Sequence, residues 1–506
     1  MKKQIKTIFG AFAVLTLLAS CTATSSGDTS SSSGSAASSS GTVSSSSGAA
    51  SSSASSGTTV SFNFWTTFGQ TATAAVEKLA ADFSEIILEQ EGVTVNITVS
   101  YQGAYDDVKN KITQGFSAGN VPTMAIAYPD HVAAYLDANP NYVYKLDDYM
   151  DSETIGFNTQ SYLGDDGCTK DDIIGAYLDE GCQYALEGYY SMPLMKSSEV
   201  LYYNADAVEL GMQDYDAAQD MSVEAFLNSL TFPELLEFGQ YCLDNKEDIL
   251  NTMEHAIWYD SDSNFFITQM YQRGIGYSSI DESGNGIIDF ESGTNRTAAE
   301  AMVTELKKYA DSGCLTTKGA EGTYGSDAFT TGEVIFEIGS SGGAGYNAPT
   351  GGTFDFGVAK VPSYAKDDNA LYVSQGPTLA FLRNPSLSDE ENDLRMKYAW
   401  QFAKFMTNAD NNTYMCVSGS EGYTPVRYSA QETSTYQQYL SSGEIYGLTA
   451  DVLLNDIDGA YYNTATFPGS SNLRDQVGGI LTTVFTDTKD VTTAFDDAIS
   501  TAKTYM

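Results

Sequence analysis

The chain has 506 residues, 42% of them hydrophobic, and its 25 Lys and Arg against 66 Asp and Glu give a formal net charge of −41. Because a nucleic-acid backbone needs clustered cations, this balance excludes a DNA- or RNA-binding protein and disfavours attraction to an anionic membrane surface. Only two histidines occur, His131 and His255, so sites built on several imidazoles are excluded as well.

The first residues predict an export signal. Lys2, Lys3 and Lys6 form a positive start, and residues 8–18 are apolar, too short to span a bilayer and typical of a signal peptide. This stretch ends in Leu-Ala-Ser before Cys21, which resembles the lipobox of bacterial lipoproteins. The resemblance implies that residues 1–20 are removed and that Cys21 carries lipid. An ordinary signal peptide that happens to meet a cysteine is the alternative.

Residues 21–59 are predicted to be a tether. Half of the residues from 22 to 59 are serine, and almost none is bulky and apolar. Such a segment cannot bury enough surface to offset its ordering entropy, so we expect it to be disordered, with the folded body beginning near Val60. The body is then expected outside the cytoplasm, anchored to the membrane by lipid, on the outer face or in the periplasm.

The remaining cysteines leave their pairing open. Cys168 and Cys182 flank a short acidic segment and are candidates for a disulfide in an oxidising compartment. Cys242, Cys314 and Cys416 complete an odd set of five, so at least one thiol is unpaired within a single chain. No C-x-x-C occurs, and we expect no metal site and no cofactor.

The folded body opens with alternating strand and helix signals. Apolar residues alternate over 60–65 and 93–99, which predicts strands, and 123–128 is an apolar strand. Apolar residues recur at helical spacing over 74–89 and 108–116. Strand–helix–strand–helix–strand order indicates an α/β fold with a mostly parallel sheet covered by helices on both faces.

Ligands of such sheets bind beyond the carboxyl ends of the strands. Two strand exits therefore stand out, residues 65–68 beginning with Trp65, and residues 128–130 ending with Asp130. Each holds an aromatic ring and a polar group. The alternative for each ring is that it caps the core.

The rest of the body continues in mixed style. The pattern predicts, in chain order, a strand over 199–203, a helix over 232–242, a hairpin over 277–290, a helix over 296–309, a strand over 333–338, and helices over 394–406, 473–485 and 491–505. We find neither repeats nor a second linker, which favours one two-lobed globule over separate domains.

Residues 339–343 match the G-x-S-x-G motif of serine hydrolases, with Ser341 central. Both histidines precede Ser341, so no general base follows it in the order that fold requires, and we interpret the segment as a loop that meets a polar ligand. Residues 281–289 resemble part of a calcium loop, but the acid falls one place short, at Glu291, and a hairpin turn is favoured.

Composition gives one further hint. The chain has 34 Tyr and 24 Phe, together with many Asp and Asn. Aromatic faces pack on the apolar C–H faces of sugars, while carboxylates and amides bind their hydroxyls. This composition suits a carbohydrate site. Paired acids such as Asp147 and Asp148 leave a glycosidase dyad as an alternative, although pairs arise by chance among 66 acids.

Residues 189–206, with the run Val-Leu-Tyr-Tyr-Asn, resemble the segment that crosses between lobes in family 1 solute-binding proteins of ABC importers, the maltose-binding-like group. The glycerol-3-phosphate-binding branch is the nearest likeness. Further matching pieces follow in the same order from Val60 to the C-terminus. They are Phe64-Trp65, 101–105, 119–122, 329–333, 340–342, 356–358 before Pro362, and 421–426.

The resemblance implies a two-lobed periplasmic-binding-protein fold with a ligand cleft between α/β lobes. It assigns residues 60–196 and 376–406 to the N-terminal lobe, and 197–375 and 407–506 to the C-terminal lobe. Five ligand contacts carry over by position, namely Tyr105, Ser197, Ser340, Gly376 and Tyr423. On chemical grounds we add Asp130 as a polar contact, and Trp65 and Trp258 as stacking residues; burial as plain core is the alternative for each tryptophan.

Two positions depart from the glycerol-3-phosphate branch. Where that branch has a contacting Glu, this chain has Pro129 followed by Asp130. Where the branch has a phosphate-binding Arg, this chain reads Phe-Pro-Gly at 467–469, with Arg474 nearby but not at the matching place. Loss of a guanidinium removes the bidentate clamp that a phosphate needs, so we expect a neutral sugar or oligosaccharide.

The sequence thus predicts a lipid-anchored, monomeric receptor that captures a carbohydrate by lobe closure and delivers it to the permease subunits of an ABC transporter, without catalysis and without nucleic acid. The alternatives are an extracytoplasmic carbohydrate-active enzyme and a surface adhesin. The sugar, its length and its linkage are not fixed by the sequence.

Overall fold

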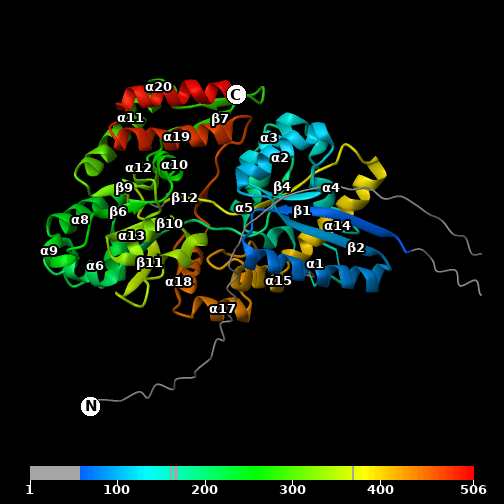
Figure 1. Cartoon of the computed structure of the whole chain (residues 1–506), viewed down its shortest axis with the longest axis horizontal. Helices are drawn as coiled ribbons and strands as arrows, with labels where there is room; N and C mark the ends of the chain where they lie inside the picture. The colour runs from blue at the N-terminus through cyan, green and yellow to red at the C-terminus, as the bar shows by residue number, and fades with distance from the viewer. Residues whose placement is uncertain (1–56, 160–161, 165–168, 367–369, 458) are drawn as a thin grey trace, which may run out of the picture. The chain divides into compact units, whose positions relative to one another are not determined.

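A computed structural model describes residues 57–159, 162–164, 169–366, 370–457 and 459–506. The predicted signal peptide, Cys21, nearly all of the predicted tether, and Cys168 lie outside these residues. Strand β1 begins at Thr59, one residue before the predicted start of the folded body. Ser56–Met506 form one compact unit, shown in Figure 1.

The first sheet has the strand order β2-β1-β3-β13-β4. Its strands are β2 (Thr94–Tyr101), β1 (Thr59–Thr66), β3 (Met124–Ala127), β13 (Thr378–Phe381) and β4 (Ser191–Pro193). Strand β1 pairs in parallel with β2 and β3, whereas β13 is antiparallel to β3 and β4.

The second sheet has the order β11-β5-β10-β6-β9. Its strands are β11 (Phe356–Lys360), β5 (Glu199–Asn204), β10 (Val334–Ser340), β6 (His255–Tyr259) and β9 (Leu315–Thr317). Strand β6 is parallel to β10 and β9, while β5 is antiparallel to β10 and β11. In each five-stranded sheet two of the four strand pairs are therefore parallel and two are antiparallel. The predicted parallel pairing is found only between strands that are connected through helices.

Two small sheets complete the strands. Strands β12 (Tyr372–Val373) and β14 (Tyr461–Tyr462) pair in parallel. The predicted hairpin forms between β7 (Ser278–Ile280) and β8 (Gly286–Ile288). In its turn Asp281 Oδ1 accepts the N–H groups of Ser283 and Asn285, both at 2.8 Å, so this carboxylate closes a turn as expected.

The helices account for most of the remaining regular structure. In the first half of the chain they are α1 (Gln70–Glu91), α2 (Tyr105–Ala118), α3 (Pro129–Ala138), α4 (Asp147–Met150), α5 (Gly175–Asp179), α6 (Ala205–Met212), α7 (Val223–Ser229), α8 (Phe232–Asp244) and α9 (Lys246–Ile249). Later come α10 (Asp262–Gln272), α11 (Gly293–Asp311), α12 (Lys318–Glu321), α13 (Gly325–Thr331), α14 (Asp389–Met406), α15 (Ala409–Tyr414), α16 (Tyr428–Gln431), α17 (Ser434–Leu440), α18 (Ile445–Asp451), α19 (Ser470–Phe485) and α20 (Val491–Ala502).

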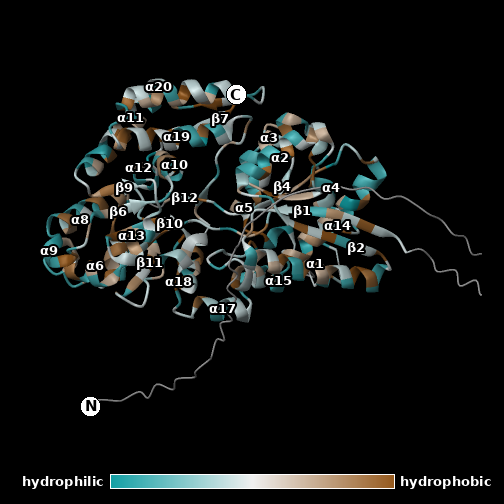
Figure 2. Cartoon of the chain, in the orientation of Figure 1, coloured by the Kyte–Doolittle hydropathy of each residue, from teal (hydrophilic) through white to brown (hydrophobic). Residues whose placement is uncertain are grey.

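Helices cover both faces of the first sheet. One face packs on α1 and α14 through residues such as Phe83 and Phe402, and the other packs on α2 and α3 through Ile112 and Val132. Figure 1 shows α2 and α3 on one side of β1 and α1 on the other. Figure 2 shows that helices such as α1 carry hydrophilic and hydrophobic residues along the same length, as expected for a helix with one buried stripe.

The second sheet has its own core, which includes Phe336 on β10, Phe238 on α8 and Leu481 on α19. We call the parts built on the two sheets the first and second lobes. Met415 and Cys416 belong to the core of the first lobe, although the predicted boundary gives residues 407–506 to the second. These residues form a π-helical turn, Met415–Gly419, that packs against α1.

The lobes are joined where chain segments cross. The backbone of Lys196 pairs with that of Thr424, and the backbone of Ser197 with that of Gln375. Gly376 has φ = 99°, and a Cβ there would lie 2.7 Å from the Met195 carbonyl oxygen. Only glycine therefore fits this crossing without strain.

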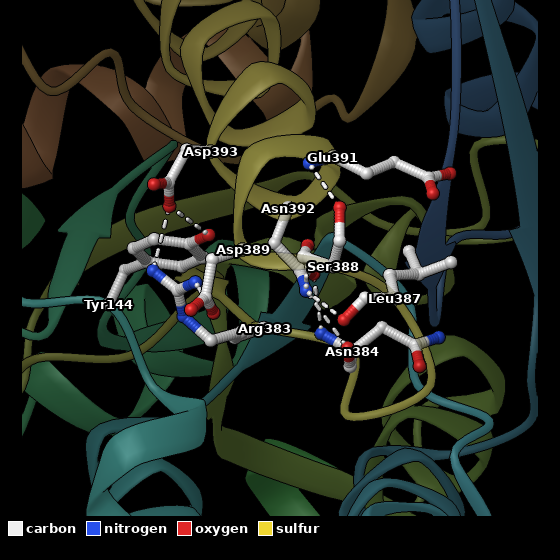
Figure 3. Close-up of polar contacts among 9 residues, drawn as sticks. All are labelled: Tyr144, Arg383, Asn384, Leu387, Ser388, Asp389, Glu391, Asn392 and Asp393. Atoms are coloured by element: carbon white, nitrogen blue, oxygen red, sulfur yellow. Dashed lines mark hydrogen bonds and ion pairs between the residues drawn. The ribbon is translucent and has the colours of Figure 1, made fainter.

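Helix α14 is fixed at its first turn, as Figure 3 shows. Ser388 Oγ accepts the Glu391 N–H at 3.2 Å, which caps the helix. The buried Asn392 Nδ2 donates to the Asn384 and Ser388 carbonyls at 2.9 and 3.1 Å. These contacts tie the helix to the loop after β13 and so hold it against the first sheet.

The described cysteines carry free thiols. Cys242, Cys314 and Cys416 are buried, and the Cys182 Sγ lies 3.3 Å from the Asp179 carbonyl oxygen. The predicted partner of Cys182, Cys168, lies outside the described residues, and Cys182 itself is a free thiol in this structure.

Candidate functional site

A cavity of about 910 Å³ is lined by residues of both lobes. Its walls come largely from the N-terminal ends of five helices, α2, α3, α10, α13 and α19, which contribute Tyr105, Asp130, Asn264, Ser326 and Arg474 among others. In the first lobe, α2 and α3 directly follow β2 and β3, so the strand exits noted in the sequence open onto this space. The volume suits a ligand of one to a few sugar rings.

The first lobe contributes an aromatic wall, which we define as Tyr105, Tyr128 and His131. The rings of Tyr105 and Tyr128 stack with centroids 4.0 Å apart and planes 21° apart. The His131 ring stands at 73° to Tyr128, 5.7 Å away. Burial lowers the pKa of His131, although nearby Asp130 opposes the shift, so the imidazole is neutral at pH 7.

The second lobe contributes an acidic wall, which we define as Glu199, Asp260 and Asp327. Glu199 is buried and accepts hydrogen bonds from the Tyr259 hydroxyl at 2.5 Å and from Asn264 Nδ2 at 2.8 Å. Burial outweighs these donors and raises the pKa of Glu199 to about 7. Asp260 Oδ1 accepts the Gly325 N–H at 2.6 Å, at the start of α13.

A guanidinium also lines the cavity, because Arg474 on α19 contacts the Asn264 side chain and lies near Asp130. Burial alone would lower the pKa of Arg474, but Asp130 and nearby phenols raise it. The sequence-based reason for excluding a phosphoester, the loss of a guanidinium, is therefore wrong. The arginine reaches the cavity from the second turn of α19 rather than from residues 467–469, where the resemblance places it.

Two lysines in the cavity wall already have partners. Lys196, 1% exposed, forms a buried ion pair with Glu180. Lys318 Nζ stands 3.6 Å from the centroid of the Tyr324 ring, a cation–π contact. Tyr324 is 52% exposed, so this ring remains open to solvent on the second-lobe side.

The predicted site residues fall into two groups. Tyr105, Asp130 and Ser340 line the cavity, and Ser340 Oγ donates to Gln375 Oε1 at 2.9 Å. Ser197 and Gly376 do not line it, but their neighbours Lys196 and Gln375 do. Side chains of successive residues in an extended segment point to opposite sides. A predicted contact that is one residue off therefore names a residue that faces away from the cavity.

Three predicted aromatic contacts lie behind the cavity. Trp65 packs on α2 and α3 in the core of the first lobe, because its neighbour Phe64 takes the opposite face of β1. Trp258 lies directly below α13, where a Cβ on Gly325 would come within 2.6 Å of its ring. Tyr423 packs in the core of the first lobe, against Gly342. The stacking role proposed for the tryptophans therefore has no support from their positions.

Sequence reasoning missed the buried charged residues of the cavity, Lys196 and Glu199, and placed the half-buried Arg474 outside it. In the sequence they look like any of the chain's many charged residues. One signal pointed to Glu199, which opens a strand of apolar and aromatic residues where every position proves buried. A charge in such a strand needs hydrogen-bond partners, and polar sites supply them.

The cavity suits a ligand with many hydroxyl groups. Seven carboxyl side chains and three of Lys or Arg are among its lining residues, together with serines, asparagines and tyrosines. The positive ends of the five helix dipoles offset part of the carboxylate charge. Within the described residues, no three His, Cys, Asp or Glu side chains are placed to hold a metal ion. In that same part of the chain, no helix is long and apolar enough to cross a membrane.

This architecture, two α/β lobes around a shared polar cavity, defines a two-lobed binding protein of the maltose-binding type. The family model described as bacterial extracellular solute-binding protein matches residues 78–441. The match covers well over half of the chain, so the chain belongs to this family of extracellular proteins, as the resemblance predicted.

Solved structures share the fold at low identity. The cyclic alpha-maltosyl-1,6-maltose binding protein from Arthrobacter globiformis is 17% identical with a TM-score of 0.63, over 88% of this chain and 98% of its own. UgpB from Mycobacterium tuberculosis, in complex with glycerophosphocholine, is 20% identical with a TM-score of 0.64, over 88% and 97%. Maltose-bound MalE3 from T. maritima is 16% identical with a TM-score of 0.59, over 89% and 100%. No curated protein sequence matches the chain.

Proposed function

We propose that this protein is the substrate receptor of an ABC importer and that it binds a neutral sugar or oligosaccharide in the cavity between its lobes. The observation that carries the proposal is the pairing of stacked tyrosine rings on one wall with the carboxyl groups of Glu199, Asp260 and Asp327 on the other. Sugars offer apolar faces to the first and hydroxyl groups to the second.

A glycerophosphodiester is the second candidate, since UgpB was solved with glycerophosphocholine and Arg474 lines the cavity here. A phosphate needs a cation that is not already compensated. Arg474 lies near Asp130, Lys196 pairs with Glu180, and carboxyl groups outnumber cations around the cavity. This balance favours the neutral ligand over the anion.

The test is thermal unfolding of the full chain with maltose, maltotriose, other mono- and oligosaccharides, and glycerophosphocholine. A ligand that binds only the native state at a hundredfold excess over Kd stabilises it by about 2.7 kcal/mol. We expect one or more sugars to raise Tm and to be recovered chemically unchanged afterwards. Glycerophosphocholine should leave Tm unchanged. A rise in Tm with glycerophosphocholine alone would favour the second candidate, a glycerophosphodiester, as the ligand. Chemical conversion of a sugar by the protein would favour an enzyme.

A matched pair of variants ties the shift to the cavity. Gly343 lines the cavity with no atom within 4 Å of an added Cβ, so Gly343→Trp fills the space and should abolish the shift. Gly479 on α19 is exposed and equally open, so Gly479→Trp should keep it. Equal shifts in both variants would place the ligand elsewhere.

Lipid anchoring and delivery to a permease complete the proposal. The support for the anchor is the lipobox-like end of the apolar stretch before Cys21. Mass spectrometry of the N-terminal peptide from the membrane fraction tests it, with diacylglycerol on Cys21 as the expected result. Cys21→Ser should prevent this modification, and an unmodified Cys21 in the membrane fraction would refute the anchor.

A further inference from the structure

A further carboxyl group lies behind the acidic wall and does not line the cavity. Glu337 on β10 is fully buried. Neither of its oxygens has a hydrogen bond of ordinary geometry among the described residues, and the same is true of the buried indole nitrogen of its register partner Trp258. A buried carboxylate without donors is costly, so this group needs a different explanation.

The backbone leaves space for this carboxyl group. A Cβ on Gly339 would lie 2.3 Å from Glu337 Oε1, and a Cβ on Gly325 would lie 3.0 Å from its Cγ. Gly325 is also the residue whose N–H binds Asp260. The Glu337 side chain therefore lies under the turn that presents Asp260 to the cavity.

The charges around Glu337 are nearly all negative. Burial and then the Asp260 carboxylate raise the pKa of Glu337 well above its usual range, and Glu199 adds to the shift. The Tyr202 phenol on β5 is its other titratable neighbour. Lys318 lowers the pKa of Asp260, and Asp327 opposes this effect. Two adjacent carboxyl groups in such a site do not both ionise.

We propose that Glu337 is a positioning residue, which keeps its own proton, donates a hydrogen bond through it to Asp260, and so keeps Asp260 as an ionised acceptor aimed at ligand hydroxyls. This inference rests on the proposed sugar-binding function, because Asp260 lines the cavity. Asp260 then receives one hydrogen bond from Gly325 N–H and one from the Glu337 O–H. The pair keeps a single negative charge, which accepts from hydroxyl groups and repels a phosphate.

The shared proton is testable without any ligand. Infrared difference spectra of the full chain at pH 7 compare wild type with Glu337→Gln, and with Glu333→Gln as the control. Glu333 is an exposed glutamate just before the same strand. We expect the carbonyl band of protonated, dry carboxyl groups to be equal in wild type and in the control and weaker in Glu337→Gln, where the part that Glu199 contributes remains. No difference between wild type and Glu337→Gln overturns the proposal.

The positioning role is tested by rescue. With maltose and maltotriose as probes, Glu337→Gln keeps a donor toward Asp260, so its Kd should stay within about threefold of wild type, whereas Glu337→Leu should weaken binding about tenfold or more. A Leu variant that binds as wild type does would overturn the role. If the protein binds a probe but the infrared band of Glu337 is missing, the shared proton is refuted and the proposed function stands. If the infrared band of Glu337 is present but no panel sugar binds, the proposed function is refuted and the shared proton stands.

Discussion

The two walls of the cavity differ in how they accommodate polar groups inside the protein. The aromatic wall stacks Tyr105 on Tyr128, so much of each ring is apolar surface and only the hydroxyl needs a partner. The acidic wall buries Glu199 under two donors and presents Asp260 from the end of β6, where it accepts the N–H at the start of α13. The difference indicates a ligand with two kinds of surface, apolar faces and hydroxyl edges.

The comparison also ranks the walls by energy. A hydrogen bond to a charged group contributes about 1.5–3 kcal/mol, whereas aromatic packing adds about 0.5–1.5 kcal/mol beyond the area buried. Changes in the acidic wall should therefore cost more affinity than changes in the aromatic wall.

The largest effect is expected for Asp260→Ala. Loss of a charged acceptor should weaken binding of the best panel sugar by about 10- to 100-fold, as measured by calorimetric titration. Glu254→Ala is the control, because this exposed glutamate stands at the opposite end of β6 and does not line the cavity. If Asp260→Ala binds as tightly as the control, the acidic wall does not contact the sugar.

The second effect is on stability and depends on pH. The pKa of Glu199 is raised to about 7 in the fold, so the native state holds a proton that the unfolded chain releases near pH 4.3. The free energy of unfolding should therefore fall as pH rises from about 4.3 to 7, by up to about 1.4 kcal/mol per pH unit from this group.

Urea unfolding at pH 5, 6, 7 and 8 measures this slope. Glu199→Gln, which cannot ionise, should make the slope shallower by the contribution of this group and leave that of Glu337, and the exposed Glu333→Gln should leave the slope unchanged. Stability that rises between pH 5 and 7 in wild type, with the same slope in both variants, would contradict the buried protonated carboxyl.

A smaller effect is expected in the aromatic wall. Tyr105→Leu removes the ring that stacks on Tyr128 and should weaken sugar binding by about 2- to 10-fold. Tyr101→Leu serves as the control, since Tyr101 is 63% exposed and lies outside the cavity. A loss larger than that of Asp260→Ala would reverse the order of the two walls.

The smallest effect is expected from salt. A neutral sugar makes no ion pair with Arg474 or Lys318, so its Kd should change by less than about twofold between 0.01 and 1 M salt, where exposed charges become fully screened. A Kd that rises steeply with salt would indicate a charged ligand and would make Arg474 the main contact.

Much of the fold followed from local pattern. Alternation placed β1 and β2 within two residues of their ends, and helical spacing found α1, although the helix begins four residues earlier than the first residue of the predicted segment. The antiparallel strands β13 and β4 could not be placed in the same way. Their partners lie far away in the sequence, and periodicity carries no information on such pairing.

The site was predicted only where residue type and strand exit agreed. Tyr105 and Asp130 follow strands and do line the cavity. Trp65 also lies at a strand exit, but its position in the alternation of β1 turns it into the core. Arg474 was set aside because it stood a few residues from an expected position, although a helical turn brings it to the cavity. Distance along the chain is a poor guide where a helix intervenes.

A crystal structure of the protein with the panel sugar that raises Tm most tests the central claim directly. The account predicts the sugar in the cavity, with a ring face against Tyr105 or Tyr128 and a hydroxyl group donating to Asp260. A sugar bound outside the cavity, or inside it with hydroxyl groups on Arg474 and none on the acidic wall, would contradict the account.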